Sequence, residues 1–301
     1  MKAQILRTRI APTPSGYLHQ GNAFSFLLTW LIAKKKGGKI LLRIDDIDAA
    51  RTRPEYLEDI FQTLDWLGIE PDEGPSDVSD FQQNFSQHLR LENYNILLEQ
   101  LKSKSMLFSC DCSRSQIKKA STNGQYPGTC RSLAKPFNTP NHAWRIITLK
   151  EENYSVPDLK SPQPTFPLTQ QMKDFVVKKK DGLPSYQIAS LADDLYYNIN
   201  FIVRGEDLVS STSAQHFLAK KLDLSHFLHT QFLHHSLLLD ASGQKLSKSE
   251  GAISIKYLRE NEISKKNLLS QMGKELGLLP THCENLNSML DNFEINAFLG
   301  K

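Results

Sequence analysis

Two short segments of this sequence carry residue types suited to phosphate chemistry. The first, residues 7–22, reads R-T-R-I-A-P-T-P-S-G-Y-L-H-Q-G-N and predicts a buried strand, a Pro/Gly turn and the start of a helix. Free backbone N–H groups at such a helix start favour an anion, and His19 and Gly21 lie where the turn enters the helix. A histidine donor beside a residue without Cβ would let the phosphates of ATP approach closely. An ordinary strand–loop–helix with a surface histidine fits the same pattern.

The second segment lies far downstream, at residues 244–251, and reads Q-K-L-S-K-S-E-G. Lys245 and Lys248, with Ser247 between them, form a cationic loop after a predicted turn. Lysines of this kind can neutralise the charge that builds up as pyrophosphate leaves. Taken alone, the string is equally typical of a solvated loop.

Three of the four cysteines form a third group, with Cys110 and Cys112 close together and Tyr126 shortly before Cys130. Three thiolates and a phenol oxygen could complete a tetrahedral structural zinc site, one per chain, in a segment that lacks a core of its own. Free thiols of a reduced protein are the alternative.

The elements that must position these groups alternate strand and helix. The apolar run 23–33 predicts a helix, 39–44 predicts a buried strand that ends in an acidic run, and Gly68 ends a second helix. This order is typical of an α/β fold with a doubly wound parallel (Rossmann-type) sheet, whose ligands bind at the carboxyl ends of the strands.

The pattern predicts four parts along the chain. Residues 1–105 form the first half of the catalytic domain, and 106–173, irregular and rich in Pro, Asn and Ser, form an insertion. The second half, 174–230, begins with a strand at 175–177. Residues 231–301 hold the lysine loop and one or two helices, followed by a polar tail.

Composition bounds the remaining properties. The chain has 301 residues, and its net charge of +3 permits a nucleic-acid partner without requiring one. No run of about 18 apolar residues is present, so no membrane span is predicted. Four cysteines in a chain of this length favour a reduced, cytoplasmic protein over a disulfide framework. No long heptad repeat is present, so we expect a monomer.

The two phosphate segments, in this order, resemble the HIGH and KMSKS signatures of class I aminoacyl-tRNA synthetases. R-I-D-D-I-D, D-G-L-P-S-Y and V-R-G-E-D-L between them resemble the glutamyl and glutaminyl branch. The resemblance implies that an amino-acid carboxylate attacks the α-phosphate of ATP, which is bound with magnesium. It assigns catalysis to His19, Lys245 and Lys248, and ATP binding to His19, Gly21, Asn22, Lys245, Ser247 and Lys248.

The resemblance also implies an amino-acid pocket made of Arg9, Ala11, Thr13, Asp45, Tyr186 and Arg204. Arg204 occupies the position where glutamate-specific members keep an arginine, so L-glutamate is the expected substrate. The neighbouring Glu206 is a local alternative partner for its guanidinium. Asp45 is a departure, since glutamate-activating members usually carry glutamate where this chain has aspartate.

Only residues 252–301 follow the lysine segment, too few for the helical anticodon-binding domain of ordinary glutamyl-tRNA synthetases. The chain therefore resembles a truncated branch that activates glutamate without tRNA and attaches it to queuosine in the anticodon of tRNA(Asp). That branch carries a zinc site matched by Cys110, Cys112, Tyr126 and Cys130. The alternatives are a minimal enzyme that charges a tRNA 3′ end, a non-catalytic RNA-binding paralogue, and a nucleotidyltransferase with the same phosphate site. The last does not account for Tyr186 and Arg204.

Overall fold

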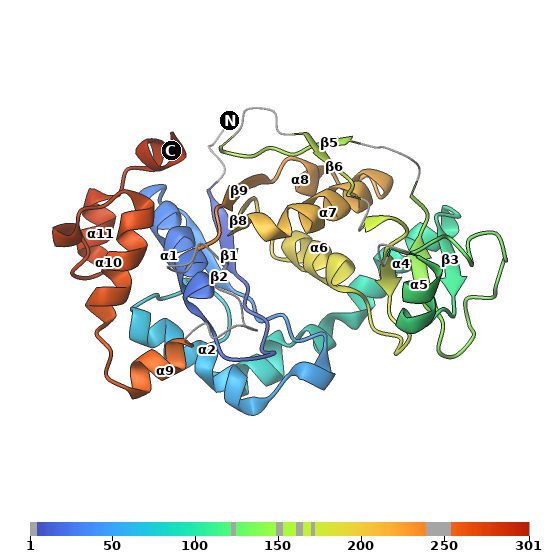
Figure 1. Ribbon diagram of the computed structural model, residues 1–301, viewed down its shortest axis with the longest axis horizontal. Coiled ribbons are helices and arrows are strands. Elements are labelled where there is room, and N and C mark those ends of the chain that lie inside the picture. Colours follow the sequence, from blue (N-terminus) through green and yellow to red (C-terminus); the bar gives the residue numbers. More distant parts are fainter. Residues whose placement is uncertain are drawn as a thin grey trace.

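The computed structural model is arranged around a set of parallel strands with helices on both sides (Figure 1). No helix within the described part of the chain is both long and apolar enough to cross a membrane. The described residues are 5–121, 125–148, 153–160, 165–169, 172–238 and 254–300.

Four parallel strands form the centre of the molecule. β1 (Arg7–Ile10) pairs with β2 (Lys39–Leu42), and β8 (Phe201–Gly205) pairs with β9 (Gln231–His235). The two pairs meet where the Asn200 N–H donates to the carbonyl of Arg7 at 3.0 Å, so β1 and β8 lie side by side in Figure 1. The spatial order β2-β1-β8-β9 confirms the predicted parallel α/β sheet, although β2 ends two residues earlier than the predicted strand.

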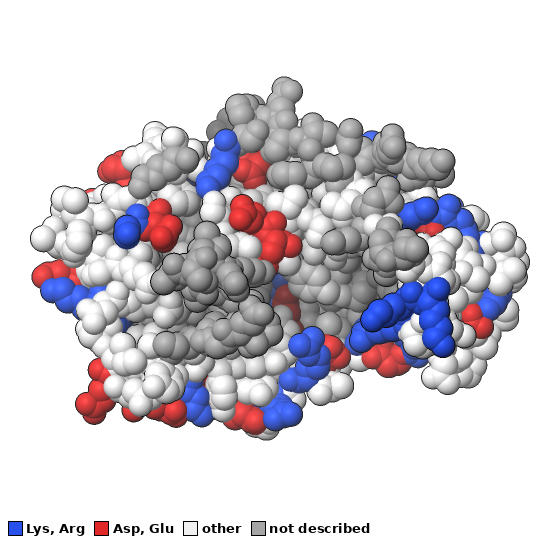
Figure 2. Space-filling view, viewed as in Figure 1, with Lys and Arg blue, Asp and Glu red and all other residues white. Residues whose placement is uncertain are grey.

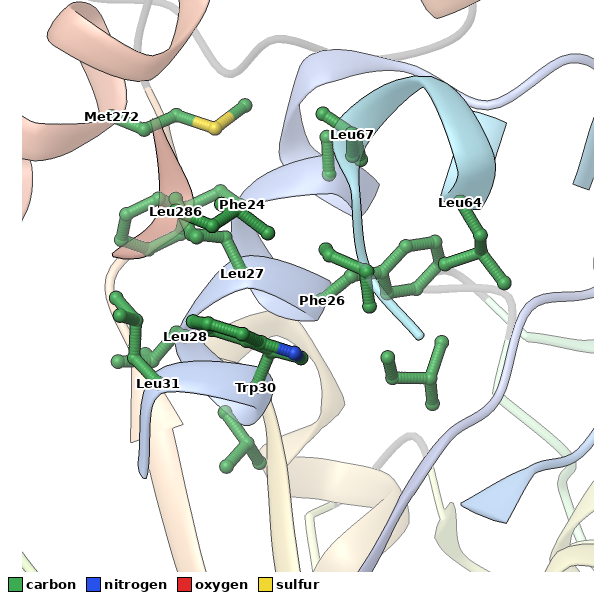
Figure 3. Close-up of a cluster of buried hydrophobic side chains, with 14 of the residues drawn as sticks. Phe24, Phe26, Leu27, Leu28, Trp30, Leu31, Leu64, Leu67, Met272 and Leu286 are labelled. Atoms are coloured by element: carbon green, nitrogen blue, oxygen red, sulfur yellow. The ribbon is translucent and has the colours of Figure 1, made fainter. Parts of the chain in front are cut away.

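One face of the strands is covered by α1 (Gln20–Lys35) and α2 (Pro54–Leu67). α1 is apolar on nearly all sides because it is packed between the sheet and the C-terminal helices. Figure 3 shows its aromatic and leucine side chains between Leu64 and Leu67 of α2 and Met272 and Leu286 of the C-terminal part. Gly68 ends α2 in the left-handed conformation, as the sequence predicts.

The other face holds a second core cluster, formed by α4 (Leu91–Ser103), α6 (Tyr186–Tyr196) and α7 (Val209–Lys221). α6 begins directly after Ser185, which brings Tyr186 to the first position of the helix. Short α-helices among the described residues before 230 are α3 (Val78–Asp80), α5 (Arg114–Ala120) and α8 (Ser225–Leu228).

The insertion is built on an antiparallel sheet of β3 (Leu107–Cys110), β4 (Ala143–Ile146) and β7 (Val176–Lys178). β7 begins and ends one residue later than the strand predicted at 175–177, and its partner is β4, not one of the parallel strands. It therefore extends the insertion's sheet past residue 173, while the parallel fold continues with α6. A hairpin of β5 (Asn153–Ser155) and β6 (Thr165–Pro167) completes this region.

Residues 254–300 form four α-helices and one 3-10 turn where one or two helices and a polar tail were predicted. The α-helices are α9 (Ile255–Glu260), α10 (Lys265–Leu276), α11 (Leu286–Asn292) and α12 (Ile295–Leu299). The tail is ordered because a few apolar side chains, among them Met289, Phe293 and Phe298, are buried against α1 and its neighbours.

Candidate functional site

A cavity of about 350 Å³ lies where the parallel strands end. Its walls come from the ends of β1, β8 and β9, the first turns of α1, and Tyr186 of α6. It lies between the β1–β2 and β8–β9 pairs, the position at which α/β sheets bind ligands. Of the sequence-predicted residues it brings together Arg9, Ala11, His19, Gly21, Asn22, Tyr186 and Arg204.

His19 is the N-cap of α1. Its Nδ1 accepts a hydrogen bond from the Gly21 N–H at 3.1 Å, and the side chain of Asn22 accepts from the His19 N–H at 3.1 Å. A Cβ on Gly21 would lie 3.0 Å from the ring of His19, so glycine allows this close approach. The capping box fixes the imidazole at the helix start, where backbone N–H groups favour an anion.

The lysine segment is flanked by residues of this same cavity. Leu237 and Leu238 line the wall before it. After it, Ser254 forms a bridge with His19, and the Ile255 N–H donates to the Leu18 carbonyl at 2.8 Å. Lys245, Ser247 and Lys248 themselves lie outside the described residues.

Arg204 is 3% exposed at the end of β8 and has one neutral partner. Its Nη2 donates to Gln215 Oε1 at 3.0 Å, while Nε and Nη1 have no hydrogen-bond partner among the residues described. Glu206, the local alternative, is exposed and forms no ion pair with it within that part of the chain. Burial lowers the pKa of Arg204 to about 10, with the hydroxyl of Tyr186 opposing the shift. A buried arginine left in this state is suited to an anionic ligand.

Asp45 and Thr13 do not line the cavity. Asp45 is buried and accepts two hydrogen bonds from Arg43, at 2.7 Å from Nε and 3.0 Å from Nη2. Its pKa is raised by burial, against the opposing charge of Arg43. Thr13 is exposed in the turn after β1. Arg9 does line the cavity, and its Nε donates to Asp194 at 3.0 Å.

Sequence reasoning missed Ser25, Asp207 and His235, which also line the cavity. Ser25 Oγ lies 2.6 Å from Nε2 of His235, and burial lowers the pKa of that imidazole, so it is neutral near pH 7. Ser25 was foreseeable, because it follows Asn22 at a spacing of three residues on the same face of α1.

The three insertion cysteines converge. Their Sγ atoms all lie within 4.8 Å of one another, and those of Cys112 and Cys130 are 3.5 Å apart. Two sulfurs on one tetrahedral zinc would be about 3.8 Å apart, from Zn–S bonds of about 2.3 Å, so the spacing fits that ion. The hydroxyl of Tyr126 lies 3.5 Å from Cys110 Sγ and accepts a hydrogen bond from the Cys130 N–H at 2.8 Å. The fourth predicted ligand therefore adjoins the thiols.

A second cavity, of about 880 Å³, separates this cluster from the catalytic core. It is lined by Cys112, Arg114, Arg145, Lys179 and Lys180 among others, and Tyr186 lines both cavities. Figure 2 shows Lys and Arg side chains gathered over α5 and the adjoining part of the insertion. The lining of the second cavity thus holds four cationic side chains against two carboxylates, Asp48 and Asp181, both of which form ion pairs with Lys179.

The family model for the catalytic domain of class I (E and Q) tRNA synthetases matches residues 5–297. The protein named Glutamyl-Q tRNA(Asp) synthetase in Nitratidesulfovibrio vulgaris is 33% identical over 92% of this chain and 88% of its own length. One of the same name in Symbiobacterium thermophilum is 35% identical over 94% of this chain and 91% of its own. The crystal structure of a glutamate-tRNA synthetase from Elizabethkingia anophelis has a TM-score of 0.80 at 23% identity, covering 97% of this chain and 66% of that one, a likeness of fold.

The chain therefore belongs to the class I tRNA synthetases of the glutamyl and glutaminyl type, a family of ligases. Within that family its resemblance to the Glutamyl-Q tRNA(Asp) synthetases, inferred from the short segment after the lysine loop and from the cysteine set, is confirmed along nearly the whole chain.

Proposed function

We propose that this protein activates L-glutamate with ATP to glutamyl-adenylate, without tRNA, and transfers the glutamate to queuosine in the anticodon of tRNA(Asp). The observation that carries the proposal is Arg204, a buried guanidinium in the cavity with no carboxylate partner among the residues described. A γ-carboxylate would supply the missing charge, whereas an amide would leave it uncompensated. The names of the two full-length relatives support the queuosine acceptor.

The residues divide the chemistry between them. Arg204 and Tyr186 hold the side chain of glutamate, and the α-carboxylate of glutamate attacks the α-phosphate of ATP. His19 and the start of α1 stabilise the pentavalent phosphate. Lys245 and Lys248 neutralise the leaving pyrophosphate together with magnesium. No protein nucleophile takes part, so positioning and charge stabilisation supply the rate.

Two predicted residues have revised parts in this scheme. Because Asp45 is held by Arg43 and Thr13 is exposed, neither is assigned a contact with glutamate. Arg9 and Ala11 lie on the cavity wall, which supports their proposed contact with the substrate. The second cavity shares Tyr186 with the first and has four cationic side chains in its lining, which supports a nucleic-acid acceptor that reaches the adenylate from the side of the insertion.

Cys110, Cys112, Tyr126 and Cys130 hold one structural zinc ion in this proposal. Zinc would cross-link a small segment whose own core cluster is limited to a few side chains. We expect about one zinc per chain by elemental analysis, and a melting temperature several degrees lower in Cys112→Ser. Cys283→Ser, at a buried cysteine outside the cluster, is the matched control for zinc content. The site would be contradicted if the purified protein contained no zinc and if treatment with a chelator left its melting temperature unchanged.

The first test is ATP–pyrophosphate exchange with each amino acid, with and without tRNA. Exchange with glutamate alone, followed by nuclease mapping of labelled glutamate to the anticodon of tRNA(Asp), is the expected result. Exchange that requires tRNA, with label at the 3′ end, would indicate a minimal glutamyl-tRNA synthetase instead. Exchange with glutamine would show that Arg204 does not set the substrate. No exchange with any amino acid would exclude the enzymatic function.

A further inference from the structure

The partner of Arg204 is a neutral amide, whereas the buried Arg9, Arg43 and Arg90 are each paired with a carboxylate. Gln215 lies on α7, is fully buried, and presents Oε1 to Arg204 Nη2 at 3.0 Å. Arginine only donates, so the carboxamide must turn its oxygen toward the guanidinium. Its Nε2 then has no partner among the described residues. Glutamate differs from glutamine by one group and would fit the same space with an ion pair in place of a hydrogen bond.

The remaining surroundings of Arg204 do not supply a negative charge. The ring of Phe232 lies 4.9 Å from the guanidinium carbon. The charges of Arg9 and Arg43 act on it as repulsive neighbours, and Asp194, which opposes them, is hydrogen-bonded to both of those arginines. Gln215 thus holds Arg204 in place and leaves its charge uncompensated.

We infer that Gln215 is a positioning residue that sets the preference for a side-chain carboxylate over a side-chain amide. Its neutral carboxamide orients Arg204 without neutralising it, so that a full positive charge remains for the substrate. The inference rests on the proposed activation of glutamate and extends it to a residue that does not line the substrate cavity.

The test is Gln215→Glu, which keeps the shape and adds the missing negative charge. Arg204 is then neutralised from within, and a γ-carboxylate would share it with a second carboxylate. We expect kcat/KM for glutamate to fall roughly 100-fold, chiefly through KM, as when a hydrogen bond to a charged group is lost. The value for glutamine should stay the same or rise, so the ratio of the two substrates falls at least as far.

Two further variants separate charge from shape. Gln215→Leu removes the oxygen but adds no charge, so glutamate activity should fall about 10-fold through loss of the hydrogen bond that orients Arg204, while the preference for glutamate is retained. Gln187→Glu makes the same chemical change on α6, at a buried glutamine that donates to Ser211 at 3.1 Å and forms no hydrogen bond with Arg204 among the described residues. This matched control should leave the glutamate-to-glutamine ratio unchanged.

Exchange kinetics and calorimetric binding of glutamate and of glutamine, on folded protein checked by thermal unfolding, give the readouts. A Gln215→Glu variant that keeps the wild-type preference would overturn the inference alone. A collapse of the preference in Gln187→Glu as well would also overturn it, because any buried carboxylate would then have the effect. A wild-type protein that neither binds nor exchanges glutamate would overturn the proposed function, and the inference with it.

Discussion

Two buried arginines of this core, Arg43 and Arg204, differ in the charge of their hydrogen-bond partners. Arg43 is 2% exposed and is held by Asp45, by Asp194 at 2.7 Å and by the hydroxyl of Ser190 at 3.2 Å. Together with Arg9 these groups form a cluster of two arginines and two aspartates, which is neutral overall. Arg204, equally buried, has one hydrogen bond to an amide.

The electrostatic consequences differ in direction. Burial alone would lower the pKa of both arginines, but the aspartates outweigh it at Arg43 and raise the pKa above its ordinary value. At Arg204 burial prevails. A compensated charge stabilises the arrangement of its own neighbours, and an uncompensated charge is available to a ligand. The structural and the binding arginine are thus distinguished by their partners, since their exposure is the same.

The comparison is tested most severely by Arg43→Met. We expect the free energy of unfolding to fall by about 3–5 kcal/mol, because Asp45 would be left buried without a partner. Urea denaturation followed by circular dichroism measures the change. Adding Asp45→Asn to this variant should restore part of the loss, since the orphaned charge is then gone. A loss below about 1 kcal/mol would show that the cluster is not the compensated unit described here.

Arg204→Met should show the opposite profile. The free energy of unfolding should change by only about 1 kcal/mol, because the lost hydrogen bond to Gln215 is offset by removal of a desolvated charge. Glutamate exchange should fall by about 100-fold or more, which corresponds to about 2.7 kcal/mol. Arg204→Lys should not restore the activity, because an ammonium lacks the planar donor geometry. A decrease in the free energy of unfolding as large as that of Arg43→Met would show that Arg204 is a structural arginine like Arg43.

The sequence alone predicted the role of Arg204 but not the ion pairs of Arg43. Arg204 was placed at the end of a strand because the apolar run before it is a local signal. Arg43 and Asp45 stand two residues apart on an extended segment, a spacing that puts both side chains on one face and could have indicated their ion pair. Their link to Asp194 joins distant parts of the chain and has no local signature. The partner of β7 was missed for the same reason, since a three-residue strand carries no information on pairing.

The C-terminal helices and the cysteine cluster also differ in how far the sequence alone could predict them. Residue types and spacing identified Cys110, Cys112 and Cys130 as a group, and the structure brings their sulfurs together. The helices after residue 254 were underestimated because their apolar residues are sparse and become meaningful only against α1. Patterns of a single element are therefore readable from the sequence, whereas contacts between elements required the structure.

Near Arg204 lies another buried side chain whose hydrogen bonds are incomplete, His216, which follows Gln215 on α7. Its ring packs against Phe227 and Phe232, and its Nε2 has no partner among the described residues. Burial, with the charge of Arg204 adding to it, lowers the pKa of His216 to about 3. The folded protein therefore keeps this imidazole neutral, while the unfolded chain takes up a proton below about pH 6.5.

This difference gives an expected effect on stability that is confined to acid. Since the unfolded state binds the extra proton, His216 should cost about 1.4 kcal/mol of stability for each pH unit below about 6.5, down to the folded pKa. Relative to His216→Phe, the wild-type protein should therefore lose about 2 kcal/mol between pH 7 and pH 5. Urea denaturation of both proteins across this range measures the difference, from which any constant packing effect of phenylalanine cancels. A difference that is independent of pH would show that His216 has the same pKa in the folded and the unfolded chain, and would contradict a neutral imidazole in the fold at pH 5.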